Sequence, residues 1–144
     1  MTVAPPSASG TRAVVERYLA ALNAHDADAI AACVSSDFFN EHTSILGTSV
    51  RGRQAYRGRL DEFLGRFGAL HYEAEAWIVD GDSAAVPYRM TCVVTEGDSA
   101  RPVEIRGMFR FEVRSGEIVH RVDYWDSGEF ARQVPPVDRT ERAS

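Results

Sequence analysis

Three segments in the first half of the chain carry apolar residues at the spacing of an α-helix. The first face consists of Val14, Val15, Tyr18, Leu19 and Leu22. The second consists of Ile30, Cys33 and Val34, and the third of Tyr56, Leu60, Phe63, Leu64 and Phe67. Thr11 and Asp26 are candidate N-caps of the first two helices, and Gly68 is a typical stop for the third. The pattern therefore predicts three helices.

In the second half, the apolar period shortens to that of a strand with one buried face. The clearest strand is 103–113, and the turn at Ser115 and Gly116 leads into another at 117–126. Two more are predicted upstream, at 86–94 and 70–80, and a short one at 37–43. Helices followed by hairpin-linked strands are typical of an α+β fold, in which the helices cover one face of an antiparallel sheet.

The two ends of the chain differ in composition from the part between them. Residues 1–10 are rich in Pro, Ser, Ala and Gly, and 135–144 is similar in character. We expect both ends to be flexible. The folded part is then one domain at 11–134, in keeping with a length of 144 residues.

Charge and composition exclude several functions. The formal net charge of −5 argues against nucleic acid or an anionic membrane surface as the main partner. The sequence has no lysine, so neither a lysine Schiff base nor a phosphate loop of the GKS type can form. There is no CxxC motif, secretory signal pattern or membrane-length apolar run. We therefore expect a cytoplasmic protein.

The strand predicted at 117–126 carries polar residues on both of its faces. One parity holds Val119, Arg121, Asp123 and Trp125, and the other holds Ile118, His120, Val122 and Tyr124. Alternation alone does not decide which parity is buried. An inward Asp123 would be a carboxylate among apolar groups, where burial raises the pKa toward that of a general acid or base at neutral pH. Alternatively, Asp123 faces solvent or pairs with Arg121 or Arg89.

His42 and Asn40 form a second candidate pair, in the segment DFFNEHT at 37–43. Alternation places both on one side of the short strand with Phe38, where an imidazole and an amide could position a water or a substrate oxygen. The alternative for His42 is a loop histidine that faces solvent or bonds to a backbone carbonyl. No two histidines have metal-ligand spacing, so the sequence predicts no metal site.

Arginines gather around the third predicted helix: Arg51, Arg53, Arg57, Arg59 and Arg66. Helix-core residues interrupt this cluster and no aromatic residues are interleaved with it. A solvated helix face is therefore favoured over an RNA-binding surface.

The order of elements and two motifs resemble a known family. The motifs are ALNAHDADAIAACV and SGEIVHRVDYWD, the latter followed by an F-x-x-Q helix. They resemble the SnoaL-like branch of the nuclear-transport-factor-2-like (NTF2-like) superfamily, over about residues 11–134. Polyketide cyclases, ketosteroid isomerases, scytalone dehydratase and limonene-epoxide hydrolase are similar proteins. The resemblance implies a cone-shaped α+β fold, with three N-terminal helices on a strongly curved mixed or antiparallel sheet around a hydrophobic pocket.

The resemblance also implies roles for individual residues. Asp123 matches a carboxylate that the cyclases and the epoxide hydrolase present to the pocket, which places Arg121, Asp123 and Trp125 inward. His42 and Asn40 match polar pocket positions, so these two and Asp123 are the expected catalytic residues. The expected substrate-binding residues are Tyr56, Tyr72, Tyr88, Met90, Phe109, Arg121 and Trp125.

The chain departs from three relatives in the residues that carry their chemistry. Limonene-epoxide hydrolase uses an Asp–Arg–Asp set, and two of its positions match Met90 and Cys92 here. Scytalone dehydratase uses more than one pocket histidine, whereas only His42 is well placed. Ketosteroid isomerase takes its base from an early strand, where this chain has Asn40. An epoxide hydrolase is therefore the less favoured reading.

The leading hypothesis is a cofactor-independent acid/base enzyme of the cyclase, isomerase or dehydratase type. It would act on a hydrophobic oxygenated molecule such as a polyketide or steroid-like ring, with Asp123 as the proton carrier. The alternatives are a binding module without chemistry and a dimerisation domain with a filled pocket. The resemblance further implies a homodimer through the outer sheet face, where Glu104, Arg106, Arg110 and Glu112 supply mixed charges.

Overall fold

Two helices, α1 (Pro6–Asn23) and α2 (Ala27–Ala32), open the fold in a computed structural model that describes residues 6–135. Asp26 caps α2 as predicted, since its side chain accepts a hydrogen bond from the Ala29 amide. The prediction that Thr11 caps the first helix is wrong. The helix begins five residues earlier, and the Thr11 hydroxyl donates instead to the Gly81 carbonyl at 2.8 Å.

The strands of the structure form one mixed sheet. They are β1 (Val34–His42), β2 (Val50–Arg51), β3 (Phe67–Ala74), β4 (Ile78–Asp80), β5 (Ser83–Glu96), β6 (Ser99–Arg114) and β7 (Glu117–Tyr124). Their order is β2-β1-β7-β6-β5-β3, and β4 pairs with β5. The β1–β7 pair is parallel, and the other pairs are antiparallel. The fold is therefore the predicted α+β class with a mixed sheet.

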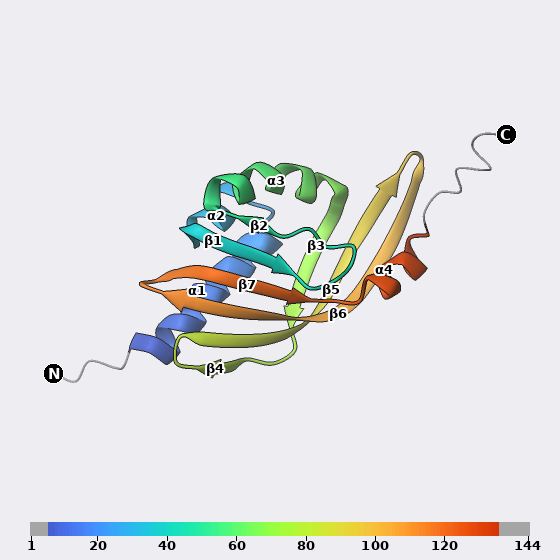
Figure 1. Cartoon of the computed structure of the whole chain (residues 1–144). Helices are drawn as coiled ribbons and strands as arrows, with labels where there is room; N and C mark the ends of the chain where they lie inside the picture. Colours follow the sequence, from blue (N-terminus) through green and yellow to red (C-terminus); the bar gives the residue numbers. More distant parts are fainter. Residues whose placement is uncertain (1–5, 136–144) are drawn as a thin grey trace.

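Two further helices complete the described chain: α3 (Arg53–Arg66) and α4 (Ser127–Gln133). In Figure 1, α3 lies along one side of the curved sheet and α1 passes behind the sheet, while α4 follows β7. Several boundaries differ from prediction. Val34 begins β1 rather than ending the second helix, and Phe67 begins β3 rather than ending the third. The strand predicted at 70–80 is two strands, β3 and β4.

The core fills the concave side of the sheet, because the apolar faces of β5 and β6 meet α1 while α3 packs against β1 and β3. The largest fully buried side chains include Tyr18, Phe38, Phe109 and Phe111. Removing a buried aromatic side chain of this kind costs about 3–5 kcal/mol. This aromatic packing supports the inner residues of β5, β6 and β7, on which the polar site is built.

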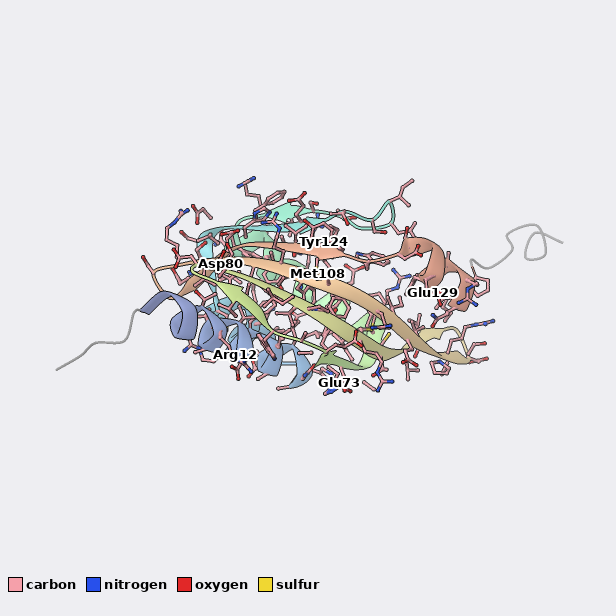
Figure 2. The ribbon with its side chains drawn as sticks, turned by 90° about the horizontal axis from the view of Figure 1, so that it is seen from below. Arg12, Glu73, Asp80, Met108, Tyr124 and Glu129 are labelled. Carbon is pink, nitrogen blue, oxygen red and sulfur yellow. The ribbon has the colours of Figure 1, made fainter. Side chains whose placement is uncertain are left out.

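The outer face of the sheet carries paired charges. Figure 2 views the molecule from below, with Glu73, Met108 and Tyr124 labelled. Arg89 contacts Glu104 at 3.0 Å and Glu73 at 3.5 Å. Arg106 contacts Glu75 at 3.0 Å, and Arg110 contacts Glu112 at 3.3 Å. These mixed charges therefore pair within the chain, and the homodimer expected through this face stays a prediction.

Candidate active site

A cavity of about 720 Å³ opens between α3 and the concave face of the sheet. Its wall is mostly apolar, and it contains all three predicted catalytic residues. Of the predicted substrate-binding residues, Tyr56, Tyr72, Tyr88, Met90, Arg121 and Trp125 line it. Phe109 is not a wall residue: it is fully buried behind the cavity, where its ring packs against Tyr72 and Tyr88 at 5.1 and 4.4 Å.

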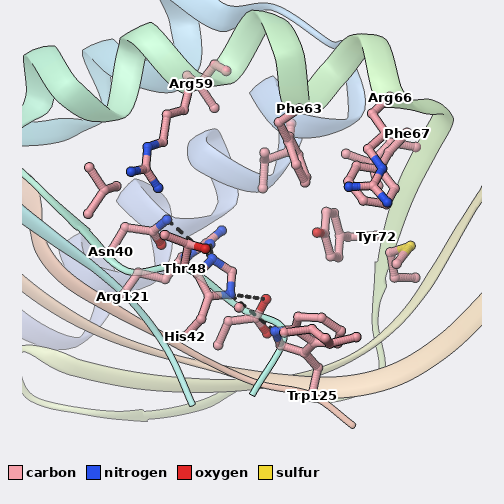
Figure 3. A pocket seen from close by; sticks show the side chains of 18 of the residues that line it. Asn40, His42, Thr48, Arg59, Phe63, Arg66, Phe67, Tyr72, Arg121 and Trp125 are labelled. Carbon is pink, nitrogen blue, oxygen red and sulfur yellow. Dashed lines mark hydrogen bonds and ion pairs between the residues drawn. The ribbon is translucent and has the colours of Figure 1, made fainter. Parts of the chain in front are cut away.

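The parallel pairing of β1 and β7 brings the polar residues together. In this register Asn40 lies opposite Arg121, and His42 lies opposite Asp123. All four side chains point to the concave face, as Figure 3 shows for Asn40, His42 and Arg121. The inward parity of 121, 123 and 125 is therefore confirmed.

Asp123 is a buried carboxylate with one oxygen held and the other open to the cavity. It is 5% exposed, and the Tyr88 hydroxyl donates to its Oδ1 at 2.6 Å. Its Oδ2 lies 3.7 Å from His42 Nδ1, beyond hydrogen-bond distance. Burial raises the pKa of Asp123 to about 6, against the opposing effects of Arg121 and the Tyr88 hydrogen bond. The structure therefore contradicts the two alternatives in which Asp123 faces solvent or pairs with Arg89, since Arg89 pairs with Glu73 and Glu104 instead.

A glycine makes the Tyr88–Asp123 contact possible. Tyr88 is on β5 and Asp123 on β7, with β6 between them, and Gly107 is the β6 residue opposite Tyr88. A Cβ at Gly107 would lie 2.4 Å from the Tyr88 hydroxyl oxygen. The tyrosine therefore reaches Asp123 only because position 107 has no side chain.

His42 is neutral in this setting. Its side chain is 19% exposed, and burial, followed by Arg121 and Arg59, lowers its pKa to about 3. Trp125 Nε1 donates to His42 Nδ1 at 3.1 Å, so the proton of the neutral ring lies on Nε2. The Asn40 amide nitrogen lies 3.4 Å from Nε2. A half-turn of this amide would present its otherwise unpaired oxygen to the Nε2 proton.

Arg121 is a buried cation at the floor of the cavity. It is 5% exposed, and its Nη1 donates to the Tyr18 hydroxyl at 2.9 Å. Its guanidinium lies over the Phe109 ring at 4.9 Å, and its Nη2 is 3.5 Å from His42 Nε2. Tyr18 in turn shares a hydrogen bond with Tyr56. In the described residues no carboxylate pairs with Arg121 within salt-bridge distance.

Sequence reasoning missed Tyr18, Gly107 and Arg59 as parts of this site. The sequence pattern places Tyr18 on a helix face, and the one available signal is that a buried tyrosine hydroxyl needs a partner. The partner, Arg121, is 103 residues away, and only the fold brings them together. The pattern also places Arg59 on a solvated helix face, whereas Arg59 lines the cavity.

Two classes of site find no support in the described residues. Within 6–135, no group of three His, Cys, Asp or Glu side chains could hold a metal ion. In the same part of the chain, no helix combines the length and apolar character needed to cross a membrane. Cys33 and Cys92 are both free thiols.

A family model described as a SnoaL-like domain matches residues 15–121. The chain belongs to the SnoaL-like family. Asp123 lies two residues beyond the matched range, on the strand that continues from it. No curated protein sequence matches this SnoaL-like domain.

Solved structures show the same fold. A protein from Xanthomonas campestris pv. campestris, proposed to be a polyketide cyclase, is 21% identical with a TM-score of 0.78, covering 88% of this chain and 97% of its own. A similar protein from Silicibacter sp. TM1040 is 20% identical with a TM-score of 0.78, covering 90% and 98%. An epoxide hydrolase from M. tuberculosis is 22% identical with a TM-score of 0.74, covering 95% and 98%. The fold of this SnoaL-like domain is that of the NTF2-like, ketosteroid isomerase-like proteins.

Proposed function

We propose that this SnoaL-like domain is a cofactor-independent enzyme that moves a proton on a hydrophobic, oxygenated small molecule, with Asp123 as the proton carrier. One observation carries the proposal. Asp123 is buried in an apolar cavity, has a pKa of about 6, and keeps Oδ2 open to the cavity. A base of this pKa is ionised at neutral pH and returns its proton readily.

The proposed first step is removal of a proton from a carbon next to a carbonyl. Asp123 Oδ2 takes the proton, the C–H electron pair forms the new C=C bond, and the carbonyl π electrons move to oxygen to give an enolate. His42 Nε2 lies 3.4 Å from the Asn40 amide nitrogen and 3.5 Å from Arg121 Nη2, so the three groups lie close together. Donors placed in this way stabilise the developing oxyanion.

Three types of reaction can follow this step. Return of the proton to a different carbon is an isomerisation, attack of the enolate on a second carbonyl closes a ring, and loss of a β-hydroxyl as water is a dehydration. Tyr72, Tyr88 and Trp125 form part of the cavity wall. Their aromatic rings keep water from the enolate and strengthen the polar contacts.

The experiment that tests the proposal follows the step that all three reactions share. Cyclic ketones of polyketide and steroid type are incubated with the protein in D₂O, and exchange of the proton next to the carbonyl is followed by NMR. We expect catalysed exchange that Asp123→Asn reduces about a hundredfold or more. Asp80→Asn, on an exposed strand residue, is the matched control and should exchange at the wild-type rate.

Two outcomes would favour other functions. Ligand binding without exchange by the wild type would indicate a binding module. Hydrolysis of a cyclic epoxide included in the panel, without ketone exchange, would indicate the activity named for the M. tuberculosis protein.

A further inference from the structure

The cavity has an excess of positive charge in an acidic protein. Three arginines line it, Arg59, Arg66 and Arg121, against two carboxylates, Glu62 and Asp123. The whole chain has a formal net charge of −5. Of the fourteen arginines within residues 6–135, seven have a carboxylate within 4 Å, and the three that line the cavity are among the seven that have none.

Two of the three arginines converge on one place. Figure 3 shows Arg59 reaching from α3 into the cavity toward Asn40, with Arg121 below Asn40. Both guanidinium groups are close enough to His42 to lower its pKa. Arg66 is two helical turns from Arg59, about 10 Å along α3, and lies over the Phe67 ring at 5.4 Å. Arg66 therefore faces a different part of the cavity.

An unpaired buried donor lies at the same place. Arg121 is 5% exposed and no acceptor in the described residues pairs with its Nε, while Asn40, 6% exposed, has its amide nitrogen 3.4 Å from His42 Nε2. Buried polar groups are normally satisfied, and a buried arginine is normally paired with an anion. Arg121 contacts aromatic rings and the neutral His42, and Asp123 acts on its charge from beyond salt-bridge distance. Because Arg121 also faces a second unpaired cation across the cavity, this place is suited to receive a negatively charged oxygen.

We propose that Arg59, Arg121 and Asn40 form a subsite for a singly charged oxygen group, a carboxylate or an ionised acidic enol, so that the ligand of this cavity is a hydrophobic organic acid. Its apolar body lies against Tyr72 and Met90. Glu62, exposed and one turn from Arg59, offsets part of the charge and disfavours groups with two negative charges. The claim that the bound acid is a substrate rests on the proposed function. The claim that the acid binds in the cavity does not depend on that function.

The test compares acids with neutral molecules of the same shape by calorimetric titration near neutral pH. One pair is 9-anthracenecarboxylic acid and its carboxamide, and the other is 2-hydroxy-1,4-naphthoquinone, an acidic enol, and its methyl ether. We expect at least one acid to bind about tenfold more tightly than its neutral partner. The pair with the larger ratio identifies the source of the charge.

Two exposed arginines of the same helix supply the variant and its matched control. Arg59→Gln should reduce the acid preference to about threefold or less, while Arg66→Gln should leave it within about twofold of the wild type. Equal binding of acid and neutral partner by the wild type would overturn the inference. An equal loss of acid preference in the two variants would also overturn the inference, because it would indicate a diffuse electrostatic effect of the positive charges rather than a subsite.

Failure of this inference can be told apart from failure of the proposed function. Binding of the acid pairs is measured without turnover, and exchange is measured on a neutral ketone, so the two readouts are independent. Acid preference without any exchange would keep the subsite and remove the enzyme. Exchange without acid preference would keep the proposed enzyme and remove the subsite.

Discussion

Replacing Tyr88 with phenylalanine should raise the pKa of Asp123 by one to two units. The variant removes the 2.6 Å hydrogen bond to Oδ1, one of the two influences that lower the pKa, and leaves the ring in place. A hydrogen bond to a charged group contributes about 1.5–3 kcal/mol, and each pKa unit corresponds to about 1.4 kcal/mol. The pKa of Asp123, about 6 in the wild type, should therefore move to about 7–8.

The shift can be measured without knowing a substrate. Protein labelled with ¹³C at the aspartate carboxyl carbon reports ionisation of Asp123 directly by NMR, and Asp123→Asn assigns the signal. Tyr72→Phe is the matched control, because Tyr72 lines the same cavity and packs against Tyr88 at 5.1 Å. The described contacts include no hydrogen bond between its hydroxyl and Asp123. The control should shift the pKa by well under one unit.

The reasoning fails if Tyr88→Phe leaves the midpoint near 6, or if Tyr72→Phe moves it equally. The first result would mean that the hydrogen bond does not favour the charged form. The second would mean that burial by the aromatic wall as a whole, rather than one donor, sets the pKa.

Three further predictions concern stability and protonation. The folded-state pKa of Asp123, about 6, lies above its ordinary value of 3.8, so the ionised carboxylate destabilises the fold above pH 6 and ceases to do so as the pH falls toward 3.8. Asp123→Asn should therefore raise the free energy of unfolding at neutral pH by up to about 3 kcal/mol, and urea denaturation should show this gain fading near pH 4. Gly107→Ala should displace Tyr88, lower the free energy of unfolding measured with urea by about 1–3 kcal/mol, and shift the NMR titration of Asp123. The control Gly58→Ala, which has open space on α3, should instead raise the free energy of unfolding by about 0.5–1 kcal/mol. The ring protons of His42 should show no titration between pH 8 and 5, whereas a midpoint near 6.5 would contradict its burial.

The periodic parts of the fold could be predicted from the sequence. The alternation at 103–113 describes the inward face of β6, where Val103, Ile105, Phe109 and Phe111 are buried. Boundaries were less predictable where one apolar run serves two elements. Phe67 continues the helical stripe of α3 and yet begins β3.

The inward face of β7 could not be chosen from alternation. Both parities mix aliphatic and polar residues, and each polar residue finds its partners on a distant element. His120 faces outward because Phe39 stacks on its ring at 5.2 Å and Glu41 accepts at 2.9 Å. Arg121 faces inward because Tyr18 accepts from it. Local sequence does not encode these pairings, and the family resemblance supplied the choice of face instead.

The arginines of α3 also show what local sequence cannot predict. Arg57 is in contact with Asp28 and Asp61, as expected of a solvated helix face. Arg59, two residues along the same helix, lines the cavity. Spacing placed both on α3, but which of them meets the cavity depends on the packing of that helix over β1.

The pH dependence of ketone exchange, in the wild type and in Asp123→Asn, tests the central claim most directly. The account predicts a rate that rises with pH to a plateau, with a midpoint near 6, and that falls about a hundredfold or more in the variant. A wild-type rate in Asp123→Asn, or a midpoint near the ordinary 3.8 of an exposed carboxylate, would show that Asp123 does not carry the proton.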